Sequence, residues 1–109
     1  MELKEKEAKS SGIKFFIEID GVEVGRAFLY LMHNDLHEEP FGLVEDVFVN
    51  EEFRGQSIGT KLVNKIIESA KEHKCYKLIC TSRHCREKVH KLYAKLGFTN
   101  HGLEFRMNF

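Results

Sequence analysis

One stretch decides the fold of this chain: Arg54-Gly55-Gln56-Ser57-Ile58-Gly59-Thr60. The residues before it, Phe41 to Asn50, form a mostly apolar run that is typical of a strand covered on both faces. The residues after it predict an amphipathic helix to about His73, because apolar side chains recur every three or four positions: Ile58, Leu62, Val63, Ile66, Ile67 and Ala70. A strand, a glycine-containing turn and a helix in this order point backbone N–H groups at a phosphate.

The turn has two interpretations that the residues alone leave open. Gly55, Gly59 and the small Ser57 let the backbone approach a pyrophosphate closely, and no acidic residue stands between Arg54 and Thr60. The same glycines also suit an ordinary strand-to-helix turn in which glycine serves only the geometry. The spacing matches neither the Walker loop nor the dinucleotide-binding fingerprint.

Toward the N-terminus, the pattern predicts a tail followed by a hairpin. Residues 1–12 alternate Lys and Glu before Ser-Ser-Gly, and we expect a frayed, charged tail. From Lys14 onward apolar residues alternate with polar ones, which predicts a strand. Asp20-Gly21 then predicts a tight turn into a return strand over Val22–Met32.

Toward the C-terminus, the pattern predicts a strand, a helix and a last strand. The stretch Cys75–Ser82 is typical of a buried strand, so strand, helix and strand imply a right-handed parallel crossover. A second apolar stripe predicts a helix that Gly97 ends: Cys85, Val89, Leu92 and Leu96. From Leu103 to Phe109 apolar and polar residues alternate, which predicts a half-buried strand.

Composition narrows the class of protein. The 109 residues have room for one domain, which we place at 13–109. A hydrophobic content of 42% and a charged content of 31% are typical of a soluble globular protein. Lys+Arg and Asp+Glu both number 17, so no excess of positive charge predicts a nucleic-acid partner. No apolar run approaches the roughly 20 residues of a membrane span, so we expect no membrane partner.

The cysteines and the first residues predict a cytoplasmic location. Three cysteines without paired spacing are typical of free thiols in a reducing compartment. The charged N-terminus also lacks the apolar core of a secretory signal.

Two motifs resemble the GNAT superfamily of N-acetyltransferases. Its acetyl-CoA motif is [Arg/Gln]-x-x-Gly-x-[Gly/Ala], which Arg54 and Gly59 match and Ser57 does not. The segment His90-Lys91-Leu92-Tyr93-Ala94-Lys95-Leu96-Gly97-Phe98 resembles the family's x-x-[Phe/Leu]-Tyr-x-x-x-Gly-Phe. The resemblance implies an α/β (α+β) fold: a mixed, mostly antiparallel central sheet with a parallel strand–helix–strand crossover, truncated at the N-terminus.

Within the superfamily, three segments are similar to glucosamine-6-phosphate N-acetyltransferases: Val44-Glu45-Asp46-Val47, Cys75-Tyr76-Lys77, and Phe98-Thr99-Asn100 with Glu104. Those proteins carry a longer N-terminal half that covers the acceptor. The resemblance therefore implies an amine acceptor (an amino sugar, a small amine or a protein amine) without choosing among them. A second subunit in a homodimer, or an open protein substrate, would then complete the site.

The resemblance implies acetyl-CoA as cosubstrate and no metal. Backbone groups of Val47, Phe48 and Val49 would bind the pantetheine arm and polarise the thioester carbonyl. The N–H groups of the turn would hold the pyrophosphate: Arg54, Gly55, Gln56, Ser57, Ile58, Gly59 and Thr60. Ser57 can still present its N–H, and its hydroxyl could donate to a phosphate oxygen or cap the helix.

Tyr93 matches the family tyrosine that faces the CoA sulfur. The resemblance implies that it is the general acid for the departing thiolate. The alternative is a core aromatic whose hydroxyl bonds to the backbone. Arg86 occupies the position, seven residues earlier, at which the family often has Asn beside the cofactor, and it could meet a CoA phosphate instead.

Transfer to an amine also needs a base, directly or through water. Glu45 and Asp46 are candidates because they interrupt an apolar strand. Alternation along a strand leaves at most one of them facing the acceptor, and we favour Glu45. The alternative is an ion pair with a neighbouring Lys or Arg, or with a second subunit. His84, just past the predicted strand Cys75–Ser82, is the second candidate.

Two other chemistries compete for the cysteines and histidines. A zinc site lacks the usual C-x2-C pairs among its candidate ligands, which are Cys75, Cys80, His84, Cys85 and His90. The second chemistry would use Cys85 as a nucleophile near a helix N-terminus. Cys85 falls on the apolar stripe, however, so we expect its side chain to be packed.

We therefore predict direct acetyl transfer to a primary amine. The alternative is a CoA-binding or protein-interaction module without catalysis.

Overall fold

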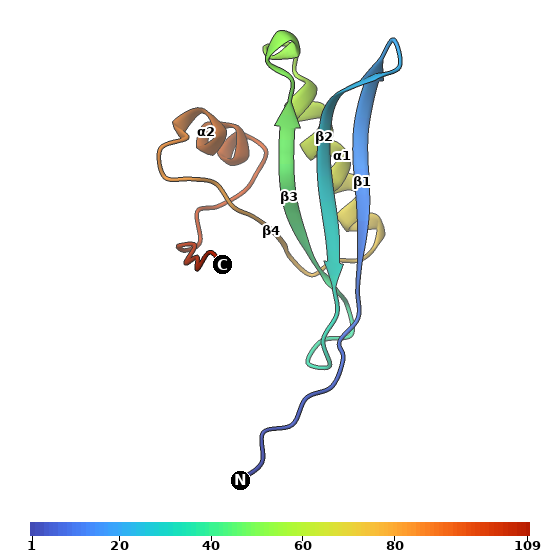
Figure 1. Cartoon of the computed structure of the whole chain (residues 1–109), viewed down its shortest axis with the longest axis vertical. Helices are drawn as coiled ribbons and strands as arrows, with labels where there is room; N and C mark the ends of the chain where they lie inside the picture. Colours follow the sequence, from blue (N-terminus) through green and yellow to red (C-terminus); the bar gives the residue numbers. More distant parts are fainter.

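The computed structural model describes all residues, 1–109, and contains one four-stranded sheet with the order β1-β2-β3-β4 (Figure 1). The strands are β1 (Ser10–Ile19), β2 (Val22–Met32), β3 (Phe41–Val49) and β4 (Leu78–Cys80). Both pairings among the first three strands are antiparallel, whereas β3 and β4 are parallel. The predicted mixed, mostly antiparallel sheet with one parallel crossover is therefore confirmed.

The hairpin of β1 and β2 turns at the predicted residues. Asp20 and Gly21 both have positive φ, +53° and +78°, which is the backbone of a two-residue hairpin turn with right-handed twist. β1 begins at Ser10, earlier than the expected Lys14, because Ser10 pairs with Met32 at the far end of β2. The part of the charged tail without secondary structure therefore ends at residue 9.

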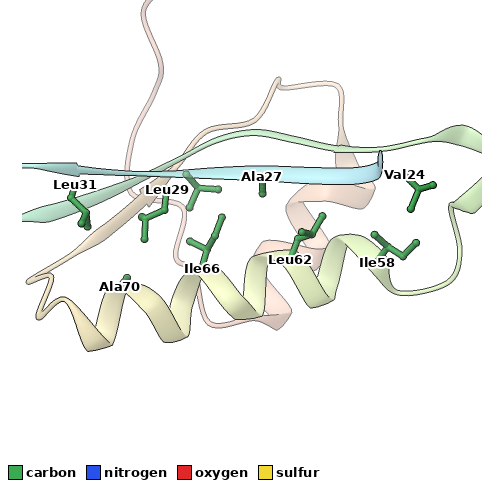
Figure 2. Packing of buried hydrophobic residues seen from close by; sticks show 9 residues of the cluster. Val24, Ala27, Leu29, Leu31, Ile58, Leu62, Ile66 and Ala70 are labelled. Atoms are coloured by element: carbon green, nitrogen blue, oxygen red, sulfur yellow. The ribbon is translucent and has the colours of Figure 1, made fainter. Parts of the chain in front are cut away.

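The core lies between the sheet and α1 (Ile58–Glu72), which packs along one face. Figure 2 shows the facing apolar side chains, which are Val24, Ala27, Leu29 and Leu31 of β2 and Ile58, Leu62, Ile66 and Ala70 of α1. The helical stripe predicted from the sequence is thus the buried face of α1, except that Ile67 is only half-buried. Burying one Leu or Ile side chain contributes about 1.5–3 kcal/mol, so this seam supplies much of the stability.

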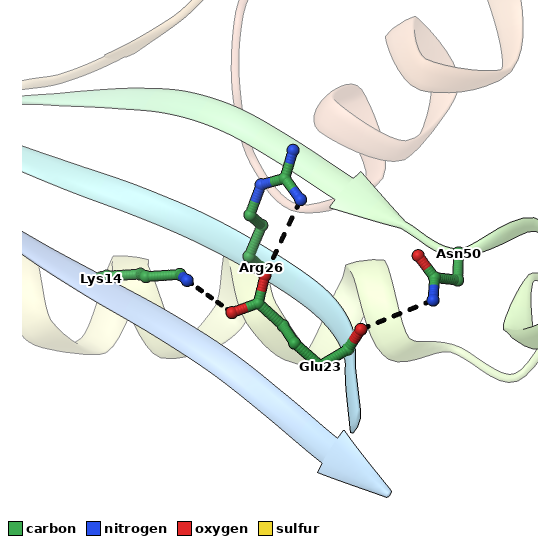
Figure 3. A network of polar contacts seen from close by, with 4 residues as sticks. All are labelled: Lys14, Glu23, Arg26 and Asn50. Carbon is green, nitrogen blue, oxygen red and sulfur yellow. Dashed lines mark hydrogen bonds and ion pairs between the residues drawn. The ribbon is translucent and has the colours of Figure 1, made fainter. Parts of the chain in front are cut away.

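The opposite face of the sheet carries a polar network near the end of the hairpin (Figure 3). The Glu23 carboxylate forms ion pairs with Lys14 of β1 and, at 3.7 Å, with Arg26. The Asn50 side-chain amide donates to the Glu23 carbonyl oxygen at 3.4 Å. The network ties β1, β2 and the end of β3 together just before the functional turn.

After α1 the chain returns through β4 and enters α2 (Glu87–Lys95). β4 is three residues long, shorter than the expected Cys75–Ser82, and pairs only with Gly42, Leu43 and Val44. Gly97, with φ +100°, follows the end of α2 as predicted. No helix is long and apolar enough to cross a membrane.

The predicted C-terminal strand is wrong. Residues 99–109 have no secondary structure, and Phe105 and Phe109 are among the most exposed apolar side chains of the chain. Alternation shows which side chains would share a face of a strand, but a strand also needs a neighbour to pair with. The short β4 at that edge of the sheet offers little backbone for such pairing.

Candidate active site

A β-bulge in β3 brings two carboxylates to one place. Glu45 pairs with Phe28 and Phe48 pairs with Arg26, so two β3 residues stand opposite Ala27 alone. Asp46 at the bulge has φ +50°, the left-handed conformation that favours glycine or Asn/Asp. The bulge breaks the alternation of the strand, and both Glu45 and Asp46 line the same cavity. Alternation therefore no longer separates the two carboxylates, and the preference for Glu45 as the one that faces the acceptor stays a prediction.

That cavity has a volume of about 260 Å³ and opens between β3 and α2. Its lining combines both carboxylates with the predicted tyrosine and several guanidinium groups from separate segments. The residues are Val44, Glu45, Asp46, Val47, Thr81, Ser82, Arg83, Arg86, Val89, Leu92, Tyr93, Glu104 and Arg106.

Tyr93 reaches the cavity from the middle of α2, and its ring packs against Phe98 with the centroids 5.5 Å apart. Burial raises the pKa of the Tyr93 phenol, and negative charge on Cys80 and Glu45 raises it further. The Arg86 guanidinium opposes this rise in pKa. A protonated phenol beside a carboxylate is the arrangement that an acid–base pair requires.

The β3–β4 ladder leaves a wedge beside this cavity. Pairing stops at Val44 and Cys80, whereas β3 continues to Val49. Val47, Phe48 and Val49, expected to bind the pantetheine arm, therefore lie where β3 has no partner on its β4 side. An extended group with amide donors and acceptors can pair with such an edge as a strand does.

The turn between β3 and α1 contains two residues with left-handed backbone conformation, Gly55 and Ser57. A short 3-10 helix, Glu51–Phe53, precedes it, and Gly55 follows with φ +84°. Ser57 has φ +62° and ψ +19°, which is a left-handed conformation. The family motif has glycine at this position. Its hydroxyl makes no capping hydrogen bond, although the Lys61 N–H donates to the Ser57 carbonyl oxygen at 3.0 Å.

Two motif residues of the turn contact the end of β3. The Arg54 Nε donates to the Val49 carbonyl oxygen at 3.0 Å, and its guanidinium lies 5.8 Å from the centre of the Phe48 ring. A Cβ on Gly59 would meet only Val49 Cγ2, at an ordinary 3.8 Å. Alanine would therefore also fit at this position, as the motif allows.

The remaining turn residues, Gln56, Ile58 and Thr60, fall on either side of the helix start. Ile58 is buried in the core, whereas Gln56 is exposed. Thr60 lines an open polar depression of about 450 Å³ together with Ser57, Lys61, Asn64, Lys65 and Glu68. This depression shares no lining residue with the cavity that Tyr93 lines. Arg86 lines the cavity with Tyr93 and does not line the depression beside the turn.

Sequence reasoning missed three charged residues of the cavity, which are Arg83, Glu104 and Arg106. Glu104 and Arg106 form an ion pair with each other at 3.0 Å. The Arg-His-Cys-Arg run after the predicted strand was a signal for Arg83, since it places cations at the strand's carboxyl end. Glu104 belongs to a segment that resembles glucosamine-6-phosphate N-acetyltransferases, but no pattern predicted that it or Arg106 would line the cavity.

The histidine and cysteine candidates lie outside this arrangement. His84 is exposed and does not line the cavity. Cys85 is exposed as well, so its expected packing is wrong: α2 begins only at Glu87, and Cys85 precedes the stripe instead of belonging to it. All three cysteines are free, and no three His, Cys, Asp or Glu side chains gather as a metal site would require.

Comparison with known proteins begins with a family model. Residues 2–98 match the model described as the Acetyltransferase (GNAT) family. A probable glucosamine 6-phosphate N-acetyltransferase 2 of Oryza sativa subsp. japonica is 38% identical over 68 residues, 62% of this chain and 39% of that protein. A probable glucosamine 6-phosphate N-acetyltransferase of Drosophila melanogaster is 33% identical over 95 residues, 83% of this chain and 42% of that protein. The chain thus spans about two fifths of the length of these relatives.

Solved structures show the same architecture. A putative acetyltransferase from Agrobacterium tumefaciens superposes with a TM-score of 0.82 at 26% identity, over 90% of this chain and 69% of that one. Glucosamine-6-phosphate N-acetyltransferase from Arabidopsis thaliana gives a TM-score of 0.80 at 25% identity, over 90% and 67% of the two chains. The matched part of this chain thus covers about two thirds of each of these structures.

Proposed function

This chain belongs to the GNAT family of acetyltransferases, and from that premise we propose that it transfers an acetyl group from acetyl-CoA to a primary amine. The observation that carries the proposal is the shared cavity of Tyr93, Glu45 and Asp46 at the point where β3 and β4 separate. An acid and a base on opposite sides of one small cavity are what direct acyl transfer between two bound substrates needs.

The residues fit acetyl-CoA in two places. The open edge of β3 at Val47, Phe48 and Val49 offers backbone partners to the pantetheine amides. The turn from Arg54 to Thr60, left-handed at Gly55 and Ser57 and followed by α1, offers N–H groups and the positive end of a helix to the pyrophosphate. Bound there, the cosubstrate supplies an acetyl group activated as a thioester.

The chain's own residues then handle the protons. We assign Glu45 as the base that takes a proton from the attacking amine, directly or through water, because its side chain is the half-buried one of the pair. Asp46 is exposed and serves the bulge. Tyr93 gives its proton to the departing thiolate, and its raised pKa keeps that proton on the phenol near neutral pH.

The acceptor is a finer proposal. The relatives described above are named as probable glucosamine 6-phosphate N-acetyltransferases, and that likeness supports an amino sugar over a small amine or a protein amine. The exposed aromatic face of the sheet, where Phe16 is 51% exposed, supports a homodimer that would cover it. Three unpaired cysteines favour a reducing, cytoplasmic compartment. Sedimentation velocity at two concentrations tests the dimer.

Two measurements in sequence test the function. Thermal shift with acetyl-CoA reports binding, and thiol release with a panel of amines that includes glucosamine 6-phosphate reports transfer. We expect stabilisation by acetyl-CoA and thiol release that depends on the amine. Stabilisation without release from any amine would favour the second candidate, a CoA-binding module, which the departure of Ser57 from the family's glycine supports. Absence of stabilisation would overturn both.

A further inference from the structure

We propose that Arg86 is a positioning residue for the general acid: its guanidinium stabilises the phenolate that Tyr93 becomes when it gives up its proton. The inference rests on the acetyl transfer proposed above. It assigns Arg86 to the tyrosine and not to a CoA phosphate, the role that the sequence alone suggested.

The helix places the two side chains on the same side. Arg86 is the residue immediately before α2, and Tyr93 stands seven residues later. Two helical turns take about 7.2 residues, so positions 86 and 93 share one face. Both line the 260 Å³ cavity, whereas neither lines the depression beside the pyrophosphate turn.

The guanidinium is free to serve this role. The Arg86 side chain makes no capping hydrogen bond at the start of α2, and it takes part in none of the ion pairs of the chain. Its structural contacts come from the backbone alone: the Arg86 N–H donates to the Arg83 carbonyl oxygen at 3.1 Å, and the Arg86 carbonyl oxygen accepts from the His90 N–H at 3.1 Å.

The surroundings of Tyr93 make such a partner useful. Burial, Glu45 and Cys80 all raise the pKa of the phenol and so disfavour the phenolate, and Arg86 is the group that lowers the pKa. The charged and titratable groups on the surrounding elements are Glu45 and Asp46 of β3, Cys80 of β4, Arg83, Arg86, Glu104 and Arg106. Glu104 and Arg106 pair with each other, which leaves Arg83 and Arg86 as the uncommitted cations of the cavity.

The chemical step explains why the phenolate needs a partner. The amine nitrogen bonds to the acetyl carbon, the carbon–sulfur bond breaks, and its electron pair leaves on sulfur. The phenol O–H proton of Tyr93 moves to that thiolate, which leaves a phenolate in a cavity where burial disfavours charge. The base releases the amine's proton to solvent, and solvent returns a proton to the phenolate before the next turnover. A neighbouring guanidinium lowers the cost of the intervening state.

The test combines a spectroscopic titration with a pH–rate profile. Tyrosinate absorbance is followed against pH in the full chain and in Arg86→Ala, each minus the matching variant that also carries Tyr93→Phe, so that only Tyr93 is reported. Without Arg86, the Tyr93 midpoint should rise by roughly 0.5–1 pH unit, and the alkaline limb of kcat should move by the same amount. Arg86→Lys should restore most of both.

Lys88→Ala is the matched control, because Lys88 is an exposed cation of the same helix that does not line the cavity. An Arg86→Ala midpoint equal to that of Lys88→Ala would overturn the inference, whatever the activity. If the Tyr93 midpoint shifts but the alkaline limb of kcat does not move, the inference is also overturned, because Arg86 would then not serve the reaction through Tyr93. Failure of the proposed function has a different readout: the unsubstituted chain would release no thiol. The titration itself needs no acceptor.

Discussion

Gly25 of β2 and Ile58 of α1 lie so close that a Cβ at position 25 would stand 2.8 Å from Ile58 Cγ2. Leu62 Cδ1 and the Phe48 carbonyl oxygen stand just beyond, at 3.3 and 3.5 Å. Ile58 is the first residue of α1 and directly follows Ser57 of the turn. The bare backbone of Gly25 thus sets how closely the start of the helix, and with it the turn, approaches the sheet.

Gly25→Ala should therefore destabilise the chain and weaken its binding of acetyl-CoA. The new methyl group must displace a β-branched side chain in the core, and such overpacking costs about 1–3 kcal/mol. Thermal or urea unfolding and calorimetric titration with acetyl-CoA measure the two effects. Gly102→Ala is the control, because a Cβ at position 102 meets nothing within 4 Å. Equal stability of the two variants would contradict the packing argument.

Ser57→Gly should stabilise the turn. Ser57 holds φ +62°, where an L-residue is disfavoured by about 1–2 kcal/mol, and its hydroxyl makes no capping bond that the change would remove. The greater flexibility of the unfolded glycine chain offsets part of this gain, so we expect a net gain of up to about 1 kcal/mol. Urea unfolding measures it. Gly55→Ala, at φ +84°, should have the opposite sign, and a loss of stability in Ser57→Gly would refute the argument.

Tyr93→Phe should lower turnover by roughly 10²–10⁴-fold, because the ring and its contact with Phe98 remain while the proton donor is lost. The affinity for acetyl-CoA should change little. Steady-state thiol release and calorimetry separate the two quantities. A variant that keeps the rate of the unsubstituted chain would remove Tyr93 from the role of acid.

Glu45→Gln and Asp46→Asn should differ in their effects although both side chains line the cavity. Glu45→Gln removes the base and should lower kcat by roughly 10²-fold or more. Asp46→Asn keeps a residue type that tolerates the left-handed conformation of the bulge, so activity should fall by less than about tenfold. The pH–rate profiles of the two variants make the comparison. The reverse order of effects would assign the base to Asp46.

Cys80 should make stability depend on alkaline pH. Burial raises the pKa of its thiol from 9.0 to about 11 in the folded chain. The folded state then holds this proton more tightly than the unfolded state, so the contribution is complete below pH 9 and is lost as pH rises toward 11. The free energy of unfolding should fall between pH 8 and pH 10.5, and it should fall less in Cys80→Ala than in the unsubstituted chain.

The burial of Cys80 should also slow its alkylation. At pH 8 the reagent should modify exposed Cys85 at least about tenfold faster than Cys80. Equal rates would contradict the burial of Cys80.

The local patterns of the sequence predicted most of the fold. Apolar spacing located α1 to within one residue of its observed end at Glu72, and Asp20-Gly21 located the hairpin turn. These features depend on contacts within one element or between neighbours in sequence. The C-terminal segment failed because its fate depends on whether an edge of the sheet is available, which no local pattern records.

The candidate site was predicted in its residues and not in its arrangement. Tyr93, Glu45 and the turn came from motifs, but the bulge at Asp46 could not be read from alternation, since a bulge inserts one residue into an otherwise regular pattern. No pattern in the residues of the turn indicated the positive φ of Ser57. Glu104 and Arg106 enter the cavity through long-range folding that one sequence does not reveal.

The early end of the β3–β4 ladder also has a consequence for association between chains. From Glu45 to Val49, β3 is an internal strand that behaves as an edge strand on one side, a template for intermolecular pairing and aggregation. The bulge at Asp46 and the two adjacent carboxylates are the devices by which natural sheets discourage such pairing. The irregularity that shapes the cavity should therefore also disfavour pairing between chains, and we expect a variant that straightened β3 to lose both.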